Sequence, residues 1–413
     1  MGGAGGGGDR LRRRVDIVDI ASPSTSVEVN LSVVHAMYEL QGWADLPDGL
    51  LHSIVALLCS FPDLHAFSST SRSWRAAFSS YPSKQTFSTL FPPLLLQPDI
   101  PWCSPCPYPI SNSFVPRLCH VTDIMNEDTY CCCQIPLFAQ INTPLSPLDE
   151  FCFRGSSYGH LILSSKTSCL LVDVFTGVTV SPPQLPVNQA THIYYGALTA
   201  PLASPDSHLI VSTDNHNLFW HVGDRSWSGR SLPNGRLTQI VVFEGKVFGM
   251  DAERNIFTVH LSPLIHIQEI SVSFEERVIR RRLGIAWLVA CTDMLLLVGC
   301  QGSSYVRTGQ TFEAFRLDLS TEPATWVKVD ILQNRAIFLG SDERSRPFCC
   351  MNPERWGGKS NCLYYYTNNR KNWTAVELGE PLKGHASNTS IFMFTSCFTM
   401  LTPMWVVPSK FSS

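Results

Sequence analysis

Three short helices are predicted near the start of the chain by the spacing of apolar residues between positions 43 and 78. In the first helix, Leu50, Ile54, Leu57 and Leu58 recur at the spacing that places side chains on one side of a helix. The two shorter patterns that follow have apolar residues one helical turn apart. The pattern therefore predicts a small unit of amphipathic helices.

Polar residues and prolines indicate where these helices begin. Asp45 is placed to cap the first helix, with Pro47 in its opening turn, where proline is tolerated. The segment 61–63 ends that helix and starts the second, and Ser71 is placed to cap the third. A unit of about 35 residues buries too little apolar surface to be stable alone. We therefore expect its apolar side to pack on the rest of the chain, as a helical cap, or on another protein.

The residues of this unit agree in type and spacing with a known domain. Leu46-Pro47, Leu50-Leu51, Pro62–Leu64 and Arg72–Arg75 resemble an F-box. The resemblance implies docking onto the small Skp adaptor of a cullin-RING ubiquitin ligase. The chain departs from many F-boxes at Thr70-Ser71, where they carry Val-Cys. The resemblance implies these adaptor contacts: Leu46, Pro47, Leu50, Ile54, Leu57 and Trp74.

From about residue 150 the pattern changes to short strands and tight turns. Between residues 239 and 261, three apolar runs are separated by turns at 244–246 and 251–255, which predicts an antiparallel meander. Hairpins of the same kind are predicted at 170–180 and 363–378. This part of the chain therefore reads as an all-β domain.

Three tryptophans indicate a longer repeat within the all-β part. Trp227, Trp326 and Trp373 are 99 and 47 residues apart, which is about two repeats and one repeat of equal length. A period near 45–50 residues with about four strands each is typical of propeller blades. The member expected near residue 275 is not apparent. An aliphatic residue follows each tryptophan by five positions, which predicts that the two lie on opposite, buried faces: Leu232, Ile331 and Leu378.

The fold class predicted is α+β and multidomain: a small N-terminal three-helix F-box followed by an all-β propeller of about five to seven blades. The segments Ser156–Leu161, Asp173–Gly177, Trp326–Val329 and Ala336–Gly340 resemble those of plant F-box proteins with a divergent, kelch-like propeller of the KIB type. That resemblance covers roughly residues 90–408 and implies recruitment of a target protein, with no enzymatic activity.

Composition divides the chain into four expected segments. Residues 1–42 are a Gly/Arg-rich tail, because glycine at that density does not hold a fold. The F-box follows over 43–80. Prolines are dense over 81–150, which predicts a linker and propeller entry with a strand or two. The substrate-binding propeller is expected over 151–408.

Charge and cysteine content exclude several classes of protein. A net charge of -3 gives no electrostatic basis for binding nucleic acid or an anionic membrane. The 15 cysteines are irregularly spaced and no signal peptide pattern precedes them, so we expect reduced thiols in the cytoplasm and/or nucleus. The apolar stretch 285–300 is interrupted by Thr292-Asp293, which favours a hairpin over a membrane span. A second stretch, 390–407, contains Pro403 and lacks basic anchors.

Two motifs suggest chemistry but lack its context. Ser157 lies in a G-x-S-x-G string, yet strand-like residues follow it where a nucleophile elbow needs a helix. Cys103 and Cys106 form one zinc-like pair with Cys119-His120 behind it, but no second clean pair follows. Cys131–Cys133 are expected in a buried strand. We therefore predict no catalytic residue, no metal and no cofactor.

The leading hypothesis is a substrate-recognition subunit of an SCF-type (Skp–cullin–F-box) E3 ubiquitin ligase. The F-box docks the Skp adaptor, and through it the cullin and RING subunits, and the propeller recruits an unidentified target protein for ubiquitination. The first alternative is a non-ligase scaffold, whose helices pack on its own propeller. The second, an enzyme built on a propeller, needs Ser157 to be a nucleophile.

Overall fold

The computed structural model of the chain divides into two units, residues 1–46 and residues 47–413. All helices and strands named below belong to the second unit. The residues that the structure describes are 42–43, 46–83, 86–98, 117–125, 129–135, 151–165, 167–186, 192–214, 216–232, 235–273, 283–301, 311–367, 372–382 and 403–408.

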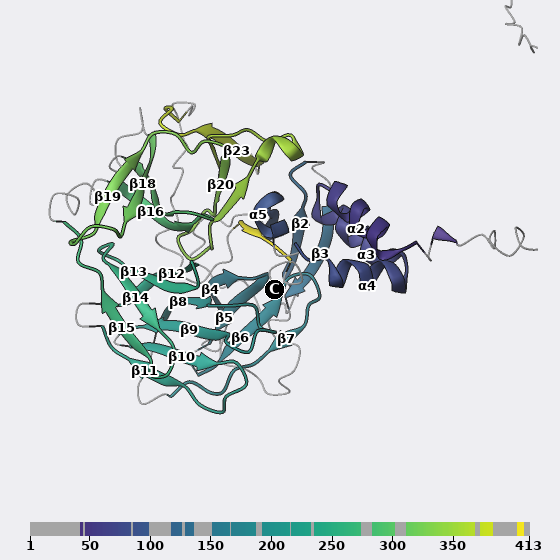
Figure 1. The fold of residues 1–413 in the computed structure, drawn as a ribbon. Helices are drawn as coiled ribbons and strands as arrows, with labels where there is room; N and C mark the ends of the chain where they lie inside the picture. Colours follow the sequence, from purple (N-terminus) through teal and green to yellow (C-terminus); the bar gives the residue numbers. More distant parts are fainter. Residues whose placement is uncertain are drawn as a thin grey trace, which may run out of the picture. The chain divides into compact units, whose positions relative to one another are not determined.

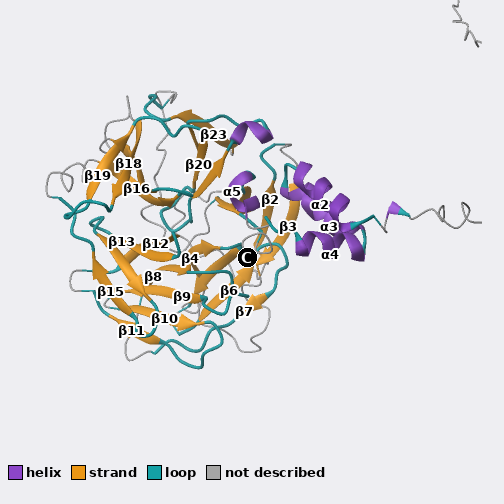
Figure 2. Ribbon diagram, in the orientation of Figure 1, coloured by secondary structure: helices purple, strands orange, loops and turns teal. Residues whose placement is uncertain are grey.

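The helical region contains the three predicted helices and a short fourth one (Figure 2). They are α2 (Asp48–Leu57), α3 (Phe61–Thr70), α4 (Arg72–Ser80) and α5 (Phe87–Leu90). The prediction for the start of α2 was wrong. Pro47 is the N-cap residue rather than part of the first turn, and no side chain caps the helix. Asp45, the expected cap, lies outside the described residues.

Serine side chains fix the starts of the next two helices. Ser60 is the N-cap of α3 and its Oγ accepts a hydrogen bond from the Asp63 backbone N–H (3.2 Å). Ser71 caps α4 in the same way, accepting from the Trp74 N–H (3.2 Å), as predicted. Each bond satisfies one of the backbone donors that a helix leaves open at its start.

Aromatic rings hold the inner side of the helical region. Phe87 of α5 stacks on Phe91 with 5.1 Å between ring centroids, and Phe91 meets Phe61 of α3 at 5.5 Å. Phe78 of α4 stacks on Phe87 at 6.4 Å. All four rings are buried. The chain therefore covers this side of the helices itself, with residues that follow the predicted F-box.

Six four-stranded sheets follow one another around a ring and form a propeller of six blades (Figure 1). This confirms the predicted fold class. The first blade consists of β1 (Leu94–Pro98), β2 (Arg117–Thr122), β3 (Thr129–Ile135) and β24 (Met404–Val406). The second consists of β4 (Cys152–Ser157), β5 (His160–Ser164), β6 (Cys169–Asp173) and β7 (Thr179–Val180).

The next two blades are regular antiparallel meanders. The third consists of β8 (Ile193–Leu198), β9 (His208–Thr213), β10 (Asn217–His221) and β11 (Ser228–Arg230). The fourth consists of β12 (Leu237–Phe243), β13 (Lys246–Asp251), β14 (Ile256–His260) and β15 (His266–Glu269). Strands β12 to β14 of the fourth blade form the meander predicted between residues 239 and 261, which is thereby confirmed.

The fifth blade is again a regular antiparallel meander, whereas the sixth has a different strand order. The fifth consists of β16 (Leu283–Ala290), β17 (Leu295–Gln301), β18 (Thr311–Asp318) and β19 (Thr325–Val329). The sixth consists of β20 (Arg335–Leu339), β21 (Phe348–Met351), β22 (Cys362–Thr367) and β23 (Asn372–Glu377). Its order is β21-β20-β22-β23, and β20 pairs with β22 in parallel. The apolar stretch 285–300 is the β16–β17 hairpin, as predicted.

The two ends of the propeller are joined in the first blade. Strand β24, near the carboxyl terminus, pairs with β1 through Leu94 and Val406, so the ring is closed by antiparallel pairing. Three strands, β1 to β3, lie in the proline-rich segment for which we expected a linker with a strand or two. None of the three has a proline in its interior, because proline cannot donate a ladder hydrogen bond. The one proline in these strands, Pro98, is the last residue of β1.

The tryptophan repeat marks the outermost strands of three blades. Trp326 lies on β19, Trp373 on β23, and Trp227 directly before β11. The outermost strand of the fourth blade, β15, has no tryptophan, which explains the gap in the repeat. One predicted partner is wrong: Ile331 lies beyond the end of β19 and is 64% exposed, and its neighbour Leu332 is buried instead.

Candidate functional site

Helix α2 has two apolar sides. Leu51 and Val55 point inward and are fully buried. Leu50 and Leu57, on another side of the same helix, expose 55% and 78% of their surface. Ile54 is half-buried between them. Large apolar side chains that are exposed together on one surface mark interaction sites. The outer side of α2 is therefore a candidate binding surface.

The six residues predicted to contact the adaptor all lie at least partly on the surface. Pro47, Leu50 and Leu57 are exposed, and Leu46, Ile54 and Trp74 are half-buried. The Trp74 ring packs against that of Phe67 with 4.6 Å between centroids, so α4 presents only one part of this side chain. None of the six is sealed inside the chain. Their contact with an adaptor stays a prediction.

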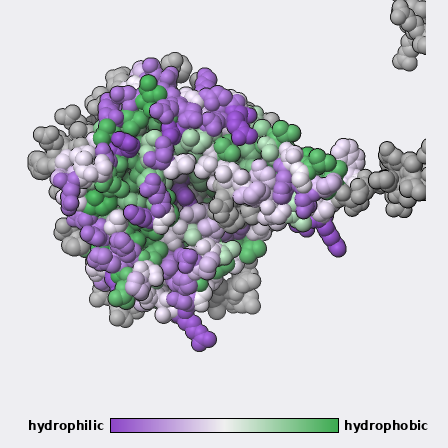
Figure 3. Space-filling view, viewed as in Figure 1, coloured by the Kyte–Doolittle hydropathy of each residue, from purple (hydrophilic) through white to green (hydrophobic). Residues whose placement is uncertain are grey.

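Few charges lie on α2, so its outer surface is mainly apolar. Asp48 is the only charged residue of the helix. His52 is turned to α4, where its Nε2 lies 3.0 Å from the Ala77 carbonyl oxygen and 3.2 Å from Ser80 Oγ. Green, hydrophobic atoms are visible on the surface of the helical region (Figure 3). Burial of the exposed part of these leucines would favour a complex by about 25 cal/mol for each Å² of apolar surface removed from water.

The departure at Thr70-Ser71 has a local structural role. Thr70 Oγ1 donates to the Ala66 carbonyl (2.9 Å) at the end of α3, and Ser71 caps α4. Both hydroxyls are therefore satisfied inside the helical region. Thr70 itself is exposed.

Ser157 of the G-x-S-x-G string lies in a row with a histidine and an aspartate. It pairs with His160 across β4 and β5, and His160 pairs with Asp173 across β5 and β6. All three side chains are buried. No local signal in the sequence predicts this row, because it depends on the register of three strands.

The bonds within this row differ from those of a catalytic triad. His160 Nδ1 lies 2.9 Å from the Tyr158 carbonyl oxygen, and its Nε2 lies 3.8 Å from Asp173 Oδ2. Ser157 Oγ instead accepts a hydrogen bond from the Leu198 N–H (3.1 Å) in the next blade. Among the described residues, no hydrogen bond joins Ser157 Oγ to the His160 ring, and a nucleophilic serine requires such a bond to its base. Ser157 instead links the second blade to the third.

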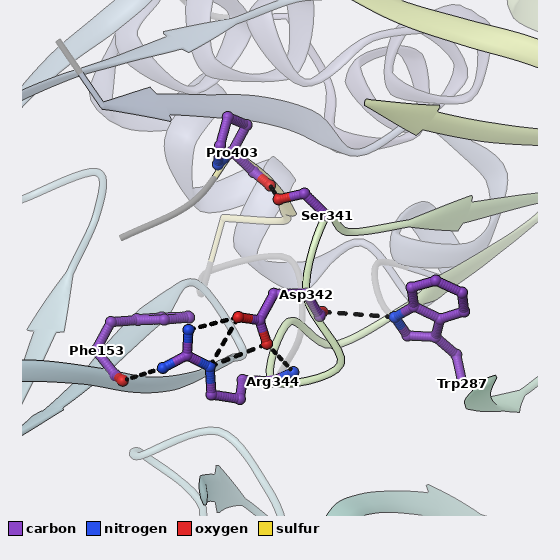
Figure 4. A network of polar contacts seen from close by, with 6 residues as sticks. All are labelled: Phe153, Trp287, Ser341, Asp342, Arg344 and Pro403. Carbon is purple, nitrogen blue, oxygen red and sulfur yellow. Dashed lines mark hydrogen bonds and ion pairs between the residues drawn. The ribbon is translucent and has the colours of Figure 1, made fainter. Parts of the chain in front are cut away.

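A polar network occupies the loop 340–347, between β20 and β21 (Figure 4). Arg344 Nε lies 2.9 Å from both carboxylate oxygens of Asp342, and its Nη1 donates to the Phe153 carbonyl on β4 (2.8 Å). The Asp342 carbonyl accepts from the Trp287 indole N–H on β16 (3.5 Å). Ser341 Oγ donates to the carbonyl of Pro403 (2.8 Å), just before β24.

This network joins residues of three blades and the segment that precedes the closing strand. Its charged pair is buried, with about 10% of each side chain exposed. Its donors and acceptors are used within the protein, as buried polar groups require. The loop therefore holds blades together, and no local signal in the sequence predicts it because its partners are up to 191 residues apart.

The zinc-like pair of the sequence is not described by the structure. Cys103 and Cys106 lie outside the described residues, and Cys119 is buried. Burial raises the pKa of the Cys131 and Cys133 thiols to about 11 each, which disfavours the thiolate that binds metals. Within the described ranges, no group of three or more His, Cys, Asp or Glu residues could hold a metal ion. In the same ranges, no helix is long and apolar enough to span a bilayer.

Comparisons with known protein families agree with this architecture. Residues 129–394 match the model of the KIB1-4 beta-propeller. The chain belongs to the KIB1-4 β-propeller family. Residues 43–86 match the F-box domain. This KIB1-4 propeller thus follows an F-box, a combination typical of adaptors rather than enzymes.

Likenesses of this KIB1-4 propeller to solved structures are partial. The N-terminal domain of Nup159 is 11% identical with a TM-score of 0.30, covering 52% of this chain and 57% of that one. The propeller domain of Cps50 (Swd1) from Myceliophteria thermophila is 14% identical with a TM-score of 0.32, covering 63% and 74%. Apo AztD from Citrobacter koseri is 13% identical with a TM-score of 0.29, covering 56% and 54%. The comparison with curated proteins gave no match.

Proposed function

We propose that this protein is a substrate-recognition subunit of an SCF-type E3 ubiquitin ligase. Helix α2 docks the Skp adaptor, and the propeller recruits a target protein for ubiquitination. The observation that carries the proposal is the exposed apolar side of α2, with Leu50 and Leu57 open while the inner side is covered by the chain itself. The protein contributes proximity between target and ubiquitin-loaded enzyme, and no catalytic group.

The test is capture of purified Skp adaptor by the full-length protein. Leu50→Asp plus Ile54→Asp places two charges on the outer side of α2, and we expect adaptor recovery to be lost, because burying unpaired carboxylates is costly. A matched control, Ala76→Asp plus Ser79→Asp, adds two charges to exposed positions of α4. Circular dichroism checks that both variants fold.

Equal recovery with wild type and the α2 variant, or no recovery with either, contradicts the proposal. The latter result favours the alternative, a non-ligase scaffold that binds a partner through its propeller. Loss of recovery with the α4 control alone would indicate that the adaptor docks on α4 rather than on α2. We expect the protein to act in the cytoplasm, the nucleus or both.

A further inference from the structure

Eight loops leave the same face of the propeller. In the four sheets from β4 to β19, antiparallel neighbours place the loops after the first and third strands at one edge. We name these loops together the hairpin face. They comprise residues 158–159, 174–178, 199–207, 222–227, 244–245, 261–265, 291–294 and 319–324, all of which the structure describes.

Contacts between blades show that these edges coincide. Ser157 at the end of β4 bonds Leu198 at the end of β8 (3.1 Å), so the first strands of these two blades end together. At the opposite edge, the N–H of Leu237, which starts β12, donates to Asn217 Oδ1, which starts β10 (3.3 Å). The β13–β14 loop likewise reaches the start of β16 through an arginine–carbonyl bond of 2.6 Å. The four sheets therefore have one common orientation.

The hairpin face carries exposed apolar side chains. Val178, Leu264 and Leu319 lie in the loops after the third strand of the second, fourth and fifth blades, and expose 61%, 75% and 46% of their surface. None is needed for the core of its blade, because each lies in a loop at the edge of a sheet. They give this face contact points for apolar groups of a partner.

The same loops carry an excess of negative charge. Five acidic residues stand against one basic residue, Arg225: Asp206, Asp224, Glu244, Asp293 and Glu322. Asp293 is paired with Arg335 (2.8 Å), and Asp224 lies 3.3 Å from His221. The other three form no ion pair with the residues that the structure describes.

The described loops at the opposite edge of these sheets are closer to balanced in charge. They hold three acidic residues, Asp214, Glu253 and Asp330, against Arg236 and Arg254. The excess of acidic residues is therefore four on the hairpin face and one at the opposite edge. Fields of this kind raise the association rate of partners of opposite charge.

We infer that the hairpin face binds the target protein through a segment that carries both basic and apolar side chains. The inference rests on the proposed function, because it names the surface with which the propeller recruits its target. The acidic loops attract and orient the segment, and the three apolar tips provide contact area. The loop 340–347, in which Asp342 and Arg344 pair with each other inside the protein, takes no part.

The test is selection of random 15-residue peptides displayed on phage against the full-length protein. We expect enrichment of peptides that combine Lys or Arg with large apolar residues. A synthetic peptide of the most enriched sequence is then titrated by fluorescence polarisation. Glu244→Lys plus Glu322→Lys should weaken its binding by about tenfold or more, as should added salt. Val178→Ser plus Leu264→Ser should also weaken it.

The matched control is Glu253→Lys plus Ile331→Ser, which changes one charge and one exposed apolar side chain outside the hairpin face. It should leave affinity within about twofold. Enrichment of acidic peptides, no enrichment, or equal binding to wild type and hairpin-face variants overturns the inference. Adaptor capture, measured on the same samples, depends on the helical region and not on the hairpin face, so its absence in the wild type would refute the proposed function and not this surface.

Discussion

Leu50 and Leu51 are adjacent in the chain and opposite in environment: Leu51 is fully buried, whereas Leu50 exposes 55% of its surface. Successive residues of an α-helix are about 100° apart around its axis, so one step along α2 separates an inner side from an outer side. The inner side stabilises the helical region and the outer side is free for a partner. The two functions of this helix can therefore be separated by mutation.

Truncation of these two leucines should have unequal effects on stability. Leu51→Ala leaves a cavity in the packed side and should lower the free energy of unfolding by about 2–5 kcal/mol. Leu50→Ala should change it by no more than about 0.5 kcal/mol, because the side chain is exposed. Urea unfolding of the full-length protein, followed by circular dichroism, measures both. Similar losses for the two variants would show that α2 is packed on both sides.

The cap of α4 makes a second, local prediction. Ser71→Ala removes the oxygen that accepts from the Trp74 N–H and should cost about 1 kcal/mol. Ser79→Ala is the control, because Ser79 is exposed and its hydroxyl only donates back to the Arg75 carbonyl of the same helix. Hydrogen exchange of the first turn of α4 should accelerate in the first variant alone. Unchanged exchange would mean that Ser71 does not hold this helix end.

Local signals in the sequence predicted the helices and most hairpins, because caps and periodicity act over a few residues. Ser71 was identified as a cap in this way, and the turn around Thr176-Gly177 as a hairpin. The start of α2 was misplaced because Asp45 and Pro47 both fit a helix start, and only the observed backbone separates them. One apolar stripe was predicted on α2, with Leu50, Ile54, Leu57 and Leu58; the second side, which packs inward through Leu51 and Val55, was not predicted.

Contacts between distant segments were not predictable from the sequence. The register that aligns Ser157 with His160 depends on strand pairing, and the same is true of the bond from Arg344 to Phe153. The inverted order in the sixth blade, with β20 parallel to β22, likewise has no local signal. Repeats indicated a propeller, but six blades could be counted only from the sheets themselves.

The buried pair in loop 340–347 should be important for stability. Arg344→Met leaves Asp342 without its partner and should cost about 3–5 kcal/mol, the usual effect of isolating a buried charge. Lys328→Met is the control, since it breaks a pair with Glu313 in which the lysine is 54% exposed; it should cost no more than about 1 kcal/mol. Thermal and urea unfolding compare the two. A small loss for Arg344→Met would show that the network is dispensable.

Glu343, in the same loop, gives stability a dependence on pH. Desolvation by burial raises the pKa of its carboxyl above the ordinary value of 4.5, although the Ala286 N–H and Arg254 oppose this. The folded state then holds the proton more tightly than the unfolded state. Stability is therefore greatest below the unfolded pKa and falls as pH rises from about 4.5 to the folded pKa.

Glu343→Gln removes this titration, so the variant should gain stability relative to wild type as pH rises through the same window. Urea unfolding at about pH 4 and about pH 7 measures the difference. Glu253→Gln, at an exposed position, is the control and should show a smaller change between the two pH values. If wild type instead gains stability relative to Glu343→Gln with rising pH, then the carboxylate is stabilised by Arg254 and the Ala286 N–H more than burial penalises it. The central loop would in that case hold a second favourable charged pair beside that of Asp342 and Arg344.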